Sequence, residues 1–263
     1  MPRIQSQGVE LYYETHGSGP QTLVFAHGMG GNAAIWFNQV AYFMEKYRII
    51  TFDHRHFARS SCTEDQFLPA LFPSDILCIM DACEVSQAHF ICQSMGGWTG
   101  SQLALMHPDR VGKLVMSHTP GVFVNRAAVN DARQVAAKVS APAPAFGSAA
   151  LAADFPARNP AGAVLYNQIS AFNGINPAVV PKAITAAQLA VDTDTLSDYR
   201  IPTLFVSADQ DNLFPASYIK ALAATLPGAR FVNLGDAGHS SYFEMPQAFN
   251  QTIEAFLEEN PTG

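Results

Sequence analysis

HFICQSMGG, residues 89–97, joins a short apolar strand pattern to a helical pattern. A sharp strand-to-helix turn of this kind needs small residues beside it, and the two closing glycines provide them. A serine at the junction, here Ser94, is exposed at the edge of a sheet, while the main-chain N–H of Met95 points toward the helix N-terminus, where it can stabilise an oxyanion. Ser94 is therefore the candidate nucleophile, and the alternative is a serine that caps an ordinary helix.

The segments around this turn alternate between strand and helix patterns. Short, mostly apolar, β-rich runs predict a parallel sheet that is buried on both faces, and residues 8–15 predict an edge strand. Helical patterns lie between these runs, so the chain is predicted to form βαβ units and an α/β fold. The strands are expected at 22–28, 47–53, 89–94, 113–118, 201–209 and 230–235, and the helices at 32–45, 73–85, 95–107, 215–226 and 246–259.

Residues 121–200 interrupt this alternation. No convincing buried strand appears there, alanine is abundant and proline recurs, which predicts several short helices. Because the segment leaves after one strand and returns at the next, we interpret it as a helical cap (lid) over the ends of the sheet. The predicted organisation is a core of residues 1–120 and 201–263 with the cap inserted at 121–200.

Composition limits the class of protein. The 263 residues are 48% hydrophobic and 14% charged, which favours one main globular core. A net charge of −7 without a Lys/Arg cluster argues against a nucleic-acid partner. Neither an apolar leader nor a run of about 18 apolar residues is found, and the four cysteines lack CxxC spacing, so we expect a cytoplasmic protein that does not bind membranes. The oligomeric state is left open, a homodimer included.

A nucleophilic serine needs a base and an orienting acid, because its own pKa is too high for unaided attack. Both residue types follow later strands. Asp211 comes after the strand at 201–209, and His239 lies on the loop after the next strand. Asp211 is preferred to Asp209 because its spacing to Pro215 carries it past the strand, whereas Asp209 would cap or brace the turn. The candidates then occur in the order Ser, Asp, His.

The first buried strand ends in HGMGG, residues 27–31. The main-chain N–H of Met29 is the candidate for a second oxyanion donor beside Met95. Residues 28–33 also match the GxGxxG/A pattern of a dinucleotide site, with Asp53 ending the next strand. That alternative would leave the order of the three catalytic candidates to chance, so no cofactor is expected.

Several residues near the strand ends are candidates to line a pocket. His54, His56 and His118 follow strands, but no ligand spacing supports a metal site. Aromatic residues in the cap favour an apolar or ring-bearing substrate, and packing of the cap interior is the alternative explanation for each of them. The predicted substrate contacts are His27, Gly28, Trp98, His118, Phe123, Phe146 and Phe172.

Together, HGMGG, DHRHFARSS (residues 53–61), CQSMGG, SADQDNLFP and DAGH resemble the α/β-hydrolase superfamily, especially its esterases and enol-lactonases of about this size. The resemblance implies an eight-stranded, mostly parallel sheet with helices on both faces and a helical lid. Family members usually have glycine in place of Cys92 before the serine, and in place of His56 and Ala58 in a DxRGxGxS motif. The positions that match this motif are expected to brace the loops: Asp53, Arg55 and Ser60.

The resemblance also implies a mechanism for a small ester or lactone substrate. His239 removes the Ser94 proton, Ser94 attacks the carbonyl, two main-chain N–H groups hold the oxyanion, and water releases the acyl group. Other functions stay open. A hydrolase of carbon–carbon bonds in a dienone or diketone would use the same residues, a ligand-binding receptor could retain a slow triad, and cofactor-free oxygen or peroxide chemistry is compatible with the same scaffold.

Overall fold

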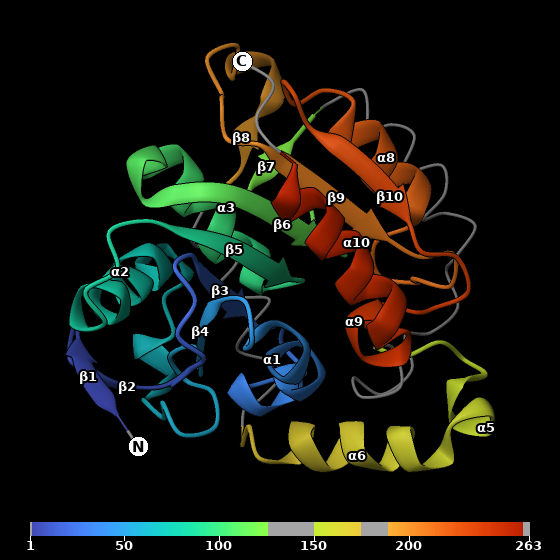
Figure 1. The fold of residues 1–263 in the computed structure, drawn as a ribbon, viewed down its shortest axis with the longest axis horizontal. Helices are drawn as coiled ribbons and strands as arrows, with labels where there is room; N and C mark the ends of the chain where they lie inside the picture. Colours follow the sequence, from blue (N-terminus) through green and yellow to red (C-terminus); the bar gives the residue numbers. More distant parts are fainter. Residues whose placement is uncertain (1, 126–149, 175–188, 260–263) are drawn as a thin grey trace.

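The computed structural model describes residues 2–125, 150–174 and 189–259. Its central sheet contains β1 (Arg3–Ser6), β2 (Val9–His16), β3 (Thr22–Ala26), β4 (Arg48–Phe52), β5 (Ala88–Gln93), β6 (Val111–Ser117), β9 (Thr203–Ser207) and β10 (Arg230–Asn233). These eight strands lie in the order β1-β2-β4-β3-β5-β6-β9-β10 (Figure 1). β2 runs antiparallel to both β1 and β4, and all other neighbours are parallel. The predicted eight-stranded, mostly parallel sheet is confirmed.

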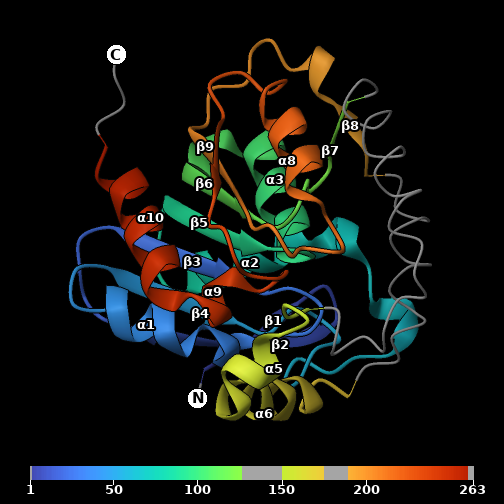
Figure 2. The same cartoon turned by 90° about the vertical axis from the view of Figure 1, so that its right-hand side faces the viewer.

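Helices cover both faces of the sheet, because successive side chains of a strand point to opposite faces. In β3, Leu23 and Phe25 pack into one apolar cluster, whereas Val24 and Ala26 pack into the other. The first cluster lies under α1 (Phe37–Phe43), α9 (Ser241–Glu244) and α10 (Pro246–Glu258), and the second under α2 (Phe72–Ala82), α3 (Gly96–Met106) and α8 (Ala216–Ala223) (Figure 2). Short 3-10 turns occur at Ala33–Trp36, Glu64–Gln66, Pro69–Leu71, Pro108–Arg110 and Thr193–Thr195.

No helix among the described residues combines the length and the apolar character that crossing a bilayer requires.

The segment predicted as an edge strand lies inside the sheet. β2 is flanked by β1 and β4, and β1 was not expected because its RIQS sequence has no apolar alternation. A residue that is distant in the sequence covers the face of β2 on which Tyr12 lies: the guanidinium of Arg59 is 3.7 Å from the ring centroid of Tyr12. Tyr12 is therefore buried on one face while Leu11 and Tyr13 are buried on the other.

Between β6 and β9 the described chain forms α5 (Phe155–Arg158), α6 (Pro160–Ala171) and a two-stranded parallel pair, β7 (Phe123–Val124) with β8 (Val191–Asp192). Each strand has only two residues and Phe123 is the one buried residue of the four, so the described part of the segment does not contradict the expectation that it lacks a buried strand. α5 and α6 lie along one edge of the molecule (Figure 1). Tyr166 of α6 packs against Phe243 of α9, with ring centroids 5.1 Å apart. The division into a core and a cap stays a prediction, because part of 121–200 lies outside the described residues.

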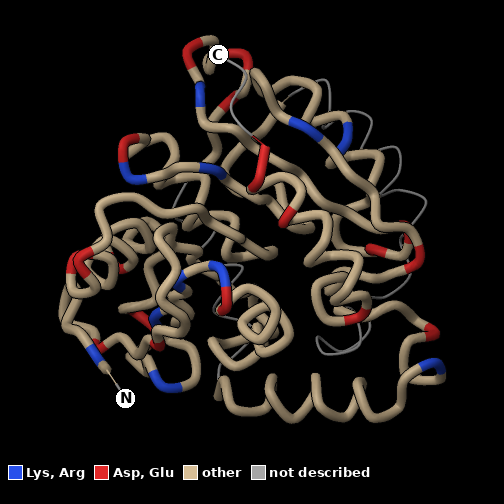
Figure 3. The backbone as a smooth tube through the Cα atoms, viewed as in Figure 1, with Lys and Arg blue, Asp and Glu red and all other residues tan. Residues whose placement is uncertain are grey.

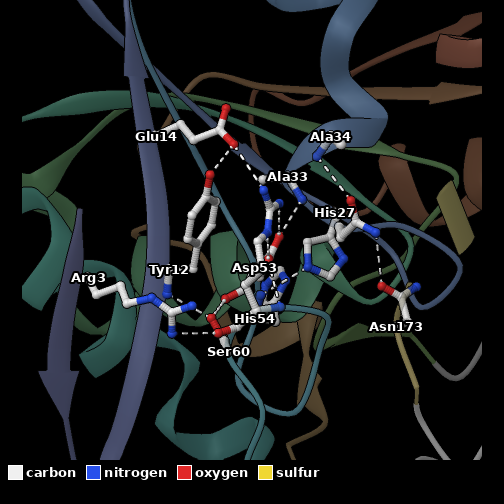
Figure 4. A network of polar contacts seen from close by, with 12 residues as sticks. Arg3, Tyr12, Glu14, His27, Ala33, Ala34, Asp53, His54, Ser60 and Asn173 are labelled. Atoms are coloured by element: carbon white, nitrogen blue, oxygen red, sulfur yellow. Dashed lines mark hydrogen bonds and ion pairs between the residues drawn. The ribbon is translucent and has the colours of Figure 1, made fainter. Parts of the chain in front are cut away.

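Two residues of the loop after β4 have the positive φ angles that usually favour glycine, although neither is glycine. His56 and Ala58 stand where the motif that this segment resembles has glycine, and their φ angles of 76° and 40° lie in the left-handed region. Asp53 stabilises this conformation by accepting hydrogen bonds from the main-chain N–H and the Nε of Arg59, at 3.0 and 2.7 Å. Ser60 Oγ donates to the Asp53 carbonyl at 2.8 Å (Figure 4). Asp53 and Ser60 brace the loop as expected.

Arg55 braces the same loop from the opposite side. Its Nε and Nη2 each lie 2.6 Å from a carboxylate oxygen of Asp75, and both side chains are buried. Ser6 Oγ donates to the same carboxylate at 2.7 Å. A buried ion pair with this geometry holds the loop to α2 and β1.

Cys92 is accommodated by a glycine on the helix that follows. Cys92 is fully buried on β5, and a Cβ atom built on Gly100 of α3 would lie 2.5 Å from its Sγ and 2.6 Å from Cδ1 of Leu114. The larger residue on the strand therefore requires the smallest residue on the helix.

We expect Gly100→Ala to lower the free energy of unfolding by about 1–3 kcal/mol, because overpacking a dense core forces side chains or backbone to shift. Urea unfolding followed by circular dichroism measures the change. In a Cys92→Ala background the overlap with Sγ disappears and the same substitution should cost less. An equal cost in both backgrounds would show that Cys92 and Gly100 are not coupled.

Candidate active site

Ser94 lies directly after β5 in a conformation that few residues adopt. Its φ angle is 50°, in the left-handed region. Its main-chain N–H donates to the carbonyl of Ser117 on β6 at 3.0 Å, and its carbonyl accepts from the N–H of Gly97 at 2.9 Å. These two bonds hold the sharp turn from strand to helix that the sequence predicted. The side chain is partly exposed at the carboxyl end of the sheet.

Gln93, the residue before Ser94, links three loops at this end of the sheet. Its Nε2 donates to the carbonyl of His239 at 3.0 Å. A Cβ atom on Gly28 would lie 1.9 Å from Gln93 Oε1 and 2.9 Å from Cβ of Ser94, so only glycine fits there. The loops after β3, β5 and β10 therefore meet around Ser94. Sequence analysis did not single out Gln93, because its role depends on contacts between loops.

Asp211 is a buried carboxylate with four hydrogen-bond donors. Its Oδ1 accepts from the main-chain N–H groups of Leu213 and Phe214, at 2.9 and 3.0 Å. Its Oδ2 lies 2.8 Å from Nδ1 of His118 and 3.0 Å from Nδ1 of His239. A carboxylate that is taken out of water needs such donors to remain ionised.

The two acid candidates have different surroundings in the structure. Asp209 is exposed and accepts a hydrogen bond from Nδ2 of Asn233 at 2.7 Å, which suits the bracing role that was the alternative for it. Asp211, in contrast, contacts His239. The opposite ring nitrogen of His239, Nε2, is buried and has no hydrogen-bond partner among the described residues. With its proton on Nδ1, His239 presents a free lone pair on Nε2.

The position of His118 differs from the one predicted from the sequence. It was predicted to contact substrate, but its side chain is fully buried, with Nδ1 on Asp211 and Nε2 at 2.7 Å from Oγ of Ser241. Its place after a strand was visible in the sequence. Its partner, on another strand's loop, was not.

The electrostatics of this group follow from burial and hydrogen bonding. Burial alone would raise the pKa of Asp211, but the charge that His239 can carry and the donors of both histidines outweigh it and hold that pKa well below its usual range. Burial lowers the pKa of His118, and the nearby Asp211 offsets only part of this effect. Asp211 is thus ionised and His118 neutral at pH 7.

The histidine loop is also fixed by Glu244 of α9. The carboxylate of Glu244 accepts from the main-chain N–H of Gly238 at 3.0 Å and from that of Ala152 at 3.2 Å. Burial raises the pKa of Glu244, and these two N–H groups partly oppose that shift. A single side chain thereby ties the residue before His239 to the segment that leads into α5.

Helix α6 holds the loop that contains Met29. Ser170 Oγ donates to the carbonyl of Gly30, and Asn32 Nδ2 donates to the carbonyl of Ile169 at 3.0 Å. Figure 4 shows Asn173, on the residues that follow α6, beside this loop. The hydroxyl of Tyr166 would lie 2.9 Å from a Cβ on Gly30 and accepts from Ser240 Oγ at 3.2 Å. α6 therefore contacts both the glycine loop and the histidine loop.

The two proposed oxyanion donors lie in the glycine loop after β3, at Met29, and directly before α3, at Met95. Within the described ranges, the main-chain N–H groups of Met29 and Met95 donate to no protein acceptor. Met95 is buried, and Met29 and Trp98 pack partly buried against the same apolar cluster. The other members of this cluster are Phe57, Phe67 and Phe72.

The remaining predicted substrate contacts have different positions. His27 is fully buried and structural: its Nδ1 donates to the Gly28 carbonyl at 2.7 Å, its Nε2 accepts from the N–H of His54 at 3.0 Å (Figure 4), and burial lowers its pKa to about 4. Phe123 is also fully buried and packs against Tyr199 in the core. Neither side chain has a surface for substrate, which corrects both predictions. Phe172 is 76% exposed, and Phe146 lies outside the described residues.

The position of Asp53 argues against the alternative of a dinucleotide-binding site. That carboxylate would have to bind a ribose hydroxyl, but it is fully buried. Its oxygens accept from the main-chain N–H of Ala33 at 2.7 Å and from Arg59. Gly28, the first glycine of that pattern, is packed against Gln93 and Ser94, which leaves no space for a pyrophosphate.

Comparison with known proteins agrees with this geometry. The family model described as alpha/beta hydrolase fold matches residues 21–246. The chain belongs to the alpha/beta hydrolase fold family. Among related sequences of this family, a protein of Caulobacter sp. (strain K31) that is named as a candidate carbamate hydrolase, RutD, is 33% identical, and the match covers 97% of this chain and 98% of the relative.

Two further members of the alpha/beta hydrolase fold family are enol-lactonases. The 3-oxoadipate enol-lactonase 2 of Acinetobacter baylyi is 26% identical, over 97% of this chain and 96% of that protein. The crystal structure of the enol-lactonase from Burkholderia xenovorans LB400 has a TM-score of 0.76 and 26% identity, over 98% of this chain and 100% of that one.

In this hydrolase, one cluster has the side chains of a metal site. Ligand atoms of His118, Asp211 and His239 lie within 4.8 Å of one another. Zinc binds histidine nitrogens only in their deprotonated form, whereas both Nδ1 atoms here act as N–H donors to the carboxylate. A cation and this hydrogen-bond network therefore exclude each other.

We expect Ser170→Ala to loosen the glycine loop of this hydrolase, since it removes the hydroxyl that holds the Gly30 carbonyl. Amide hydrogen exchange of residues 28–32 should become roughly tenfold faster, the change that loss of about 1.4 kcal/mol of local stability produces. Asn167→Ala, on the solvent face of the same helix, is the control and should leave exchange unchanged. Unaltered exchange in Ser170→Ala would mean that α6 does not support the loop.

Proposed function

We propose that this protein is a serine hydrolase that cleaves small, largely apolar carboxylic esters or lactones, with Ser94 as nucleophile, His239 as base and Asp211 as acid. The observation that carries the proposal is the state of His239. Asp211 holds its Nδ1, its Nε2 is buried and free, and Gln93 fastens its main chain to the turn that presents Ser94. This is the arrangement of an imidazole ready to take a proton from a neighbouring hydroxyl.

The reaction follows from these positions. His239 Nε2 takes the proton of Ser94 as Oγ attacks the substrate carbonyl, and Asp211 stabilises the imidazolium that forms. The imidazolium then protonates the leaving alkoxide, which leaves an acyl group on Ser94. Water, deprotonated by His239, attacks this ester and releases the acid. In a lactone the leaving alkoxide stays part of the product.

The oxyanion of each tetrahedral intermediate would be held by the main-chain N–H groups of Met29 and Met95. Both groups lack protein acceptors among the described residues, and Met95 directly precedes α3, whose N-terminus carries a partial positive charge. Loss of one such donor typically reduces the rate about 100- to 1,000-fold. The hydrogen bonds between α6 and this loop, at Gly30 and Asn32, would keep the Met29 donor in place.

An uncharged substrate suits the surroundings. α6, which we assign to the cap over this site, contains no Lys, Arg, Asp or Glu (Figure 3). Met29 and Trp98 add partly buried apolar surface near Ser94. The likeness to two enol-lactonases over nearly the whole chain favours lactones among the esters.

Carbamates are a second candidate class, because the relative from Caulobacter bears that name and is 33% identical. A carbamate ester presents the same attacked carbonyl: attack by Ser94 would release the alcohol and leave a carbamoyl group on the serine, and water would then release a carbamic acid that decomposes to an amine and carbon dioxide. Parallel assays of acid release from γ-butyrolactone and of amine release from a small N-alkyl carbamate separate the two classes.

The first test concerns Ser94. We expect a fluorophosphonate to add one adduct to the wild-type protein, on the peptide that contains Ser94, as detected by intact mass and peptide mapping. Ser94→Ala should give no adduct and should lose at least about 1,000-fold in hydrolysis of p-nitrophenyl acetate. Ser86→Ala, at an exposed serine, is the control and should react like the wild type. Full activity in folded Ser94→Ala protein would overturn the proposal.

The second test compares the two carboxylates. Asp211→Asn should lower kcat by about 10⁴, because the amide carries no negative charge and its NH2 group, when turned toward Nδ1, donates to it and favours the wrong imidazole tautomer. Asp209→Asn should stay within a few-fold of the wild type, since its partner Asn233 is exposed. Steady-state kinetics with one ester measures both. Equal losses in the two variants would contradict the assignment of Asp211.

A further inference from the structure

We propose that His118 is a positioning residue of this site: it is the second imidazole donor to Asp211 and keeps that carboxylate oriented toward His239. The proposal rests on the proposed function and extends the group of three residues by a fourth. It differs from the role expected from the sequence, in which His118 would touch the substrate.

The hydrogen bonds of Asp211 show what His118 contributes. Two main-chain N–H groups, those of Leu213 and Phe214, bind only Oδ1. With these bonds alone the carboxylate could still pivot about Oδ1 and move Oδ2 away from the histidine loop. His118 Nδ1 lies 2.8 Å from Oδ2, and His239 Nδ1 faces both oxygens, 3.0 Å from Oδ2 and 3.1 Å from Oδ1. His118 therefore fixes Oδ2, so that both carboxylate oxygens stay turned toward the Nδ1–H of His239.

The protonation of His118 makes it a donor that leaves the charge of Asp211 intact. Nδ1 must carry a proton, because the carboxylate facing it only accepts. Ser241 Oγ lies 2.7 Å from Nε2 and donates to it, which fixes the neutral tautomer. Since burial lowers the pKa of His118, no second proton is added at pH 7. A cationic side chain here would neutralise the charge that His239 needs in the transition state.

The position of His118 is built into the backbone. It follows β6 directly with a φ angle of 54°, and its main-chain N–H donates to the Val206 carbonyl of β9 at 2.8 Å. β6 lies between β5, which leads to Ser94, and β9, which leads to Asp211. The left-handed turn directs the imidazole to the Asp211 side of this arrangement. Asn, Asp and His are the non-glycine residues found most often in such a conformation, so an exchange of His for Asn keeps the turn.

The test compares His118→Phe with His118→Asn. Phenylalanine keeps a planar ring but has no donor, whereas the Asn side-chain amide can donate from nearly the place of Nδ1. We expect kcat of the Phe variant to fall about tenfold at unchanged KM, which is what a hydrogen bond to a charged group can contribute. The Asn variant should retain kcat within about threefold. Equal losses in both variants would overturn the proposal, because packing would then explain the effect.

Proton NMR provides a readout that does not require turnover and remains informative if a variant is inactive. Two imidazole N–H groups on one buried carboxylate should give two low-field resonances in the wild type, and both should shift in Asp211→Asn. In His118→Asn one resonance should disappear, and the His239 resonance should keep its position. A single low-field resonance in the wild type would overturn the pairing of His118 with Asp211.

These readouts separate the two proposals. A wild-type protein that shows both resonances but forms no fluorophosphonate adduct and hydrolyses no ester would refute the serine hydrolase alone. A wild type that forms the adduct, with a folded His118→Phe variant of unchanged kcat, would refute the positioning role alone. Thermal unfolding of each variant establishes that it is folded before the kinetics are compared.

Discussion

The buried negative charge of Asp211 is the constraint on which the site depends. An ionised carboxylate without water is stable only if donors replace the lost hydration. The chain supplies two of these donors from the loop that carries Asp211 and one from each neighbouring loop, through His118 after β6 and His239 after β10. The adjacency of β6, β9 and β10 in the sheet is therefore required by the charge as well as by the apolar core.

The sequence predicted those features that depend on local pattern. Strand and helix positions agree to within a few residues, and Ser94, Asp211 and His239 lie at the carboxyl ends of β5, β9 and β10. The preference for Asp211 over Asp209 rested on spacing, and the contact with His239 agrees with it. Such features can be predicted from the sequence, because the period of side chains along a strand and the residues that a sharp turn tolerates are properties of short segments.

Features that depend on distant partners were not predictable. β2 alternates like an edge strand, yet it pairs with β1, whose sequence has no apolar alternation, and so lies inside the sheet. Phe123 and Phe172 carry the same side chain, but one is fully buried in the core and the other is 76% exposed. His27 and His118 differ in the same way from what their positions after strands implied, because each finds its acceptor within the protein. A residue type indicates which bonds a side chain can form, whereas the tertiary fold selects the partner.

The left-handed residues at the ends of β5 and β6 show how the sheet itself prepares the site. Ser94 and His118 each follow a strand with positive φ, which costs on the order of 1 kcal/mol per residue. In both cases the main-chain N–H bonds to the neighbouring strand, at Ser117 and Val206, so the parallel ladder continues one step beyond the strands. The same kind of main-chain bond occurs after β9, where the N–H of Asp209 donates to the carbonyl of Gly235 at 2.8 Å. Because these bonds hold the backbone before any substrate binds, the register of the sheet positions Ser94 and His118, and with the roles proposed for them little reorganisation would remain for a reaction to bring about.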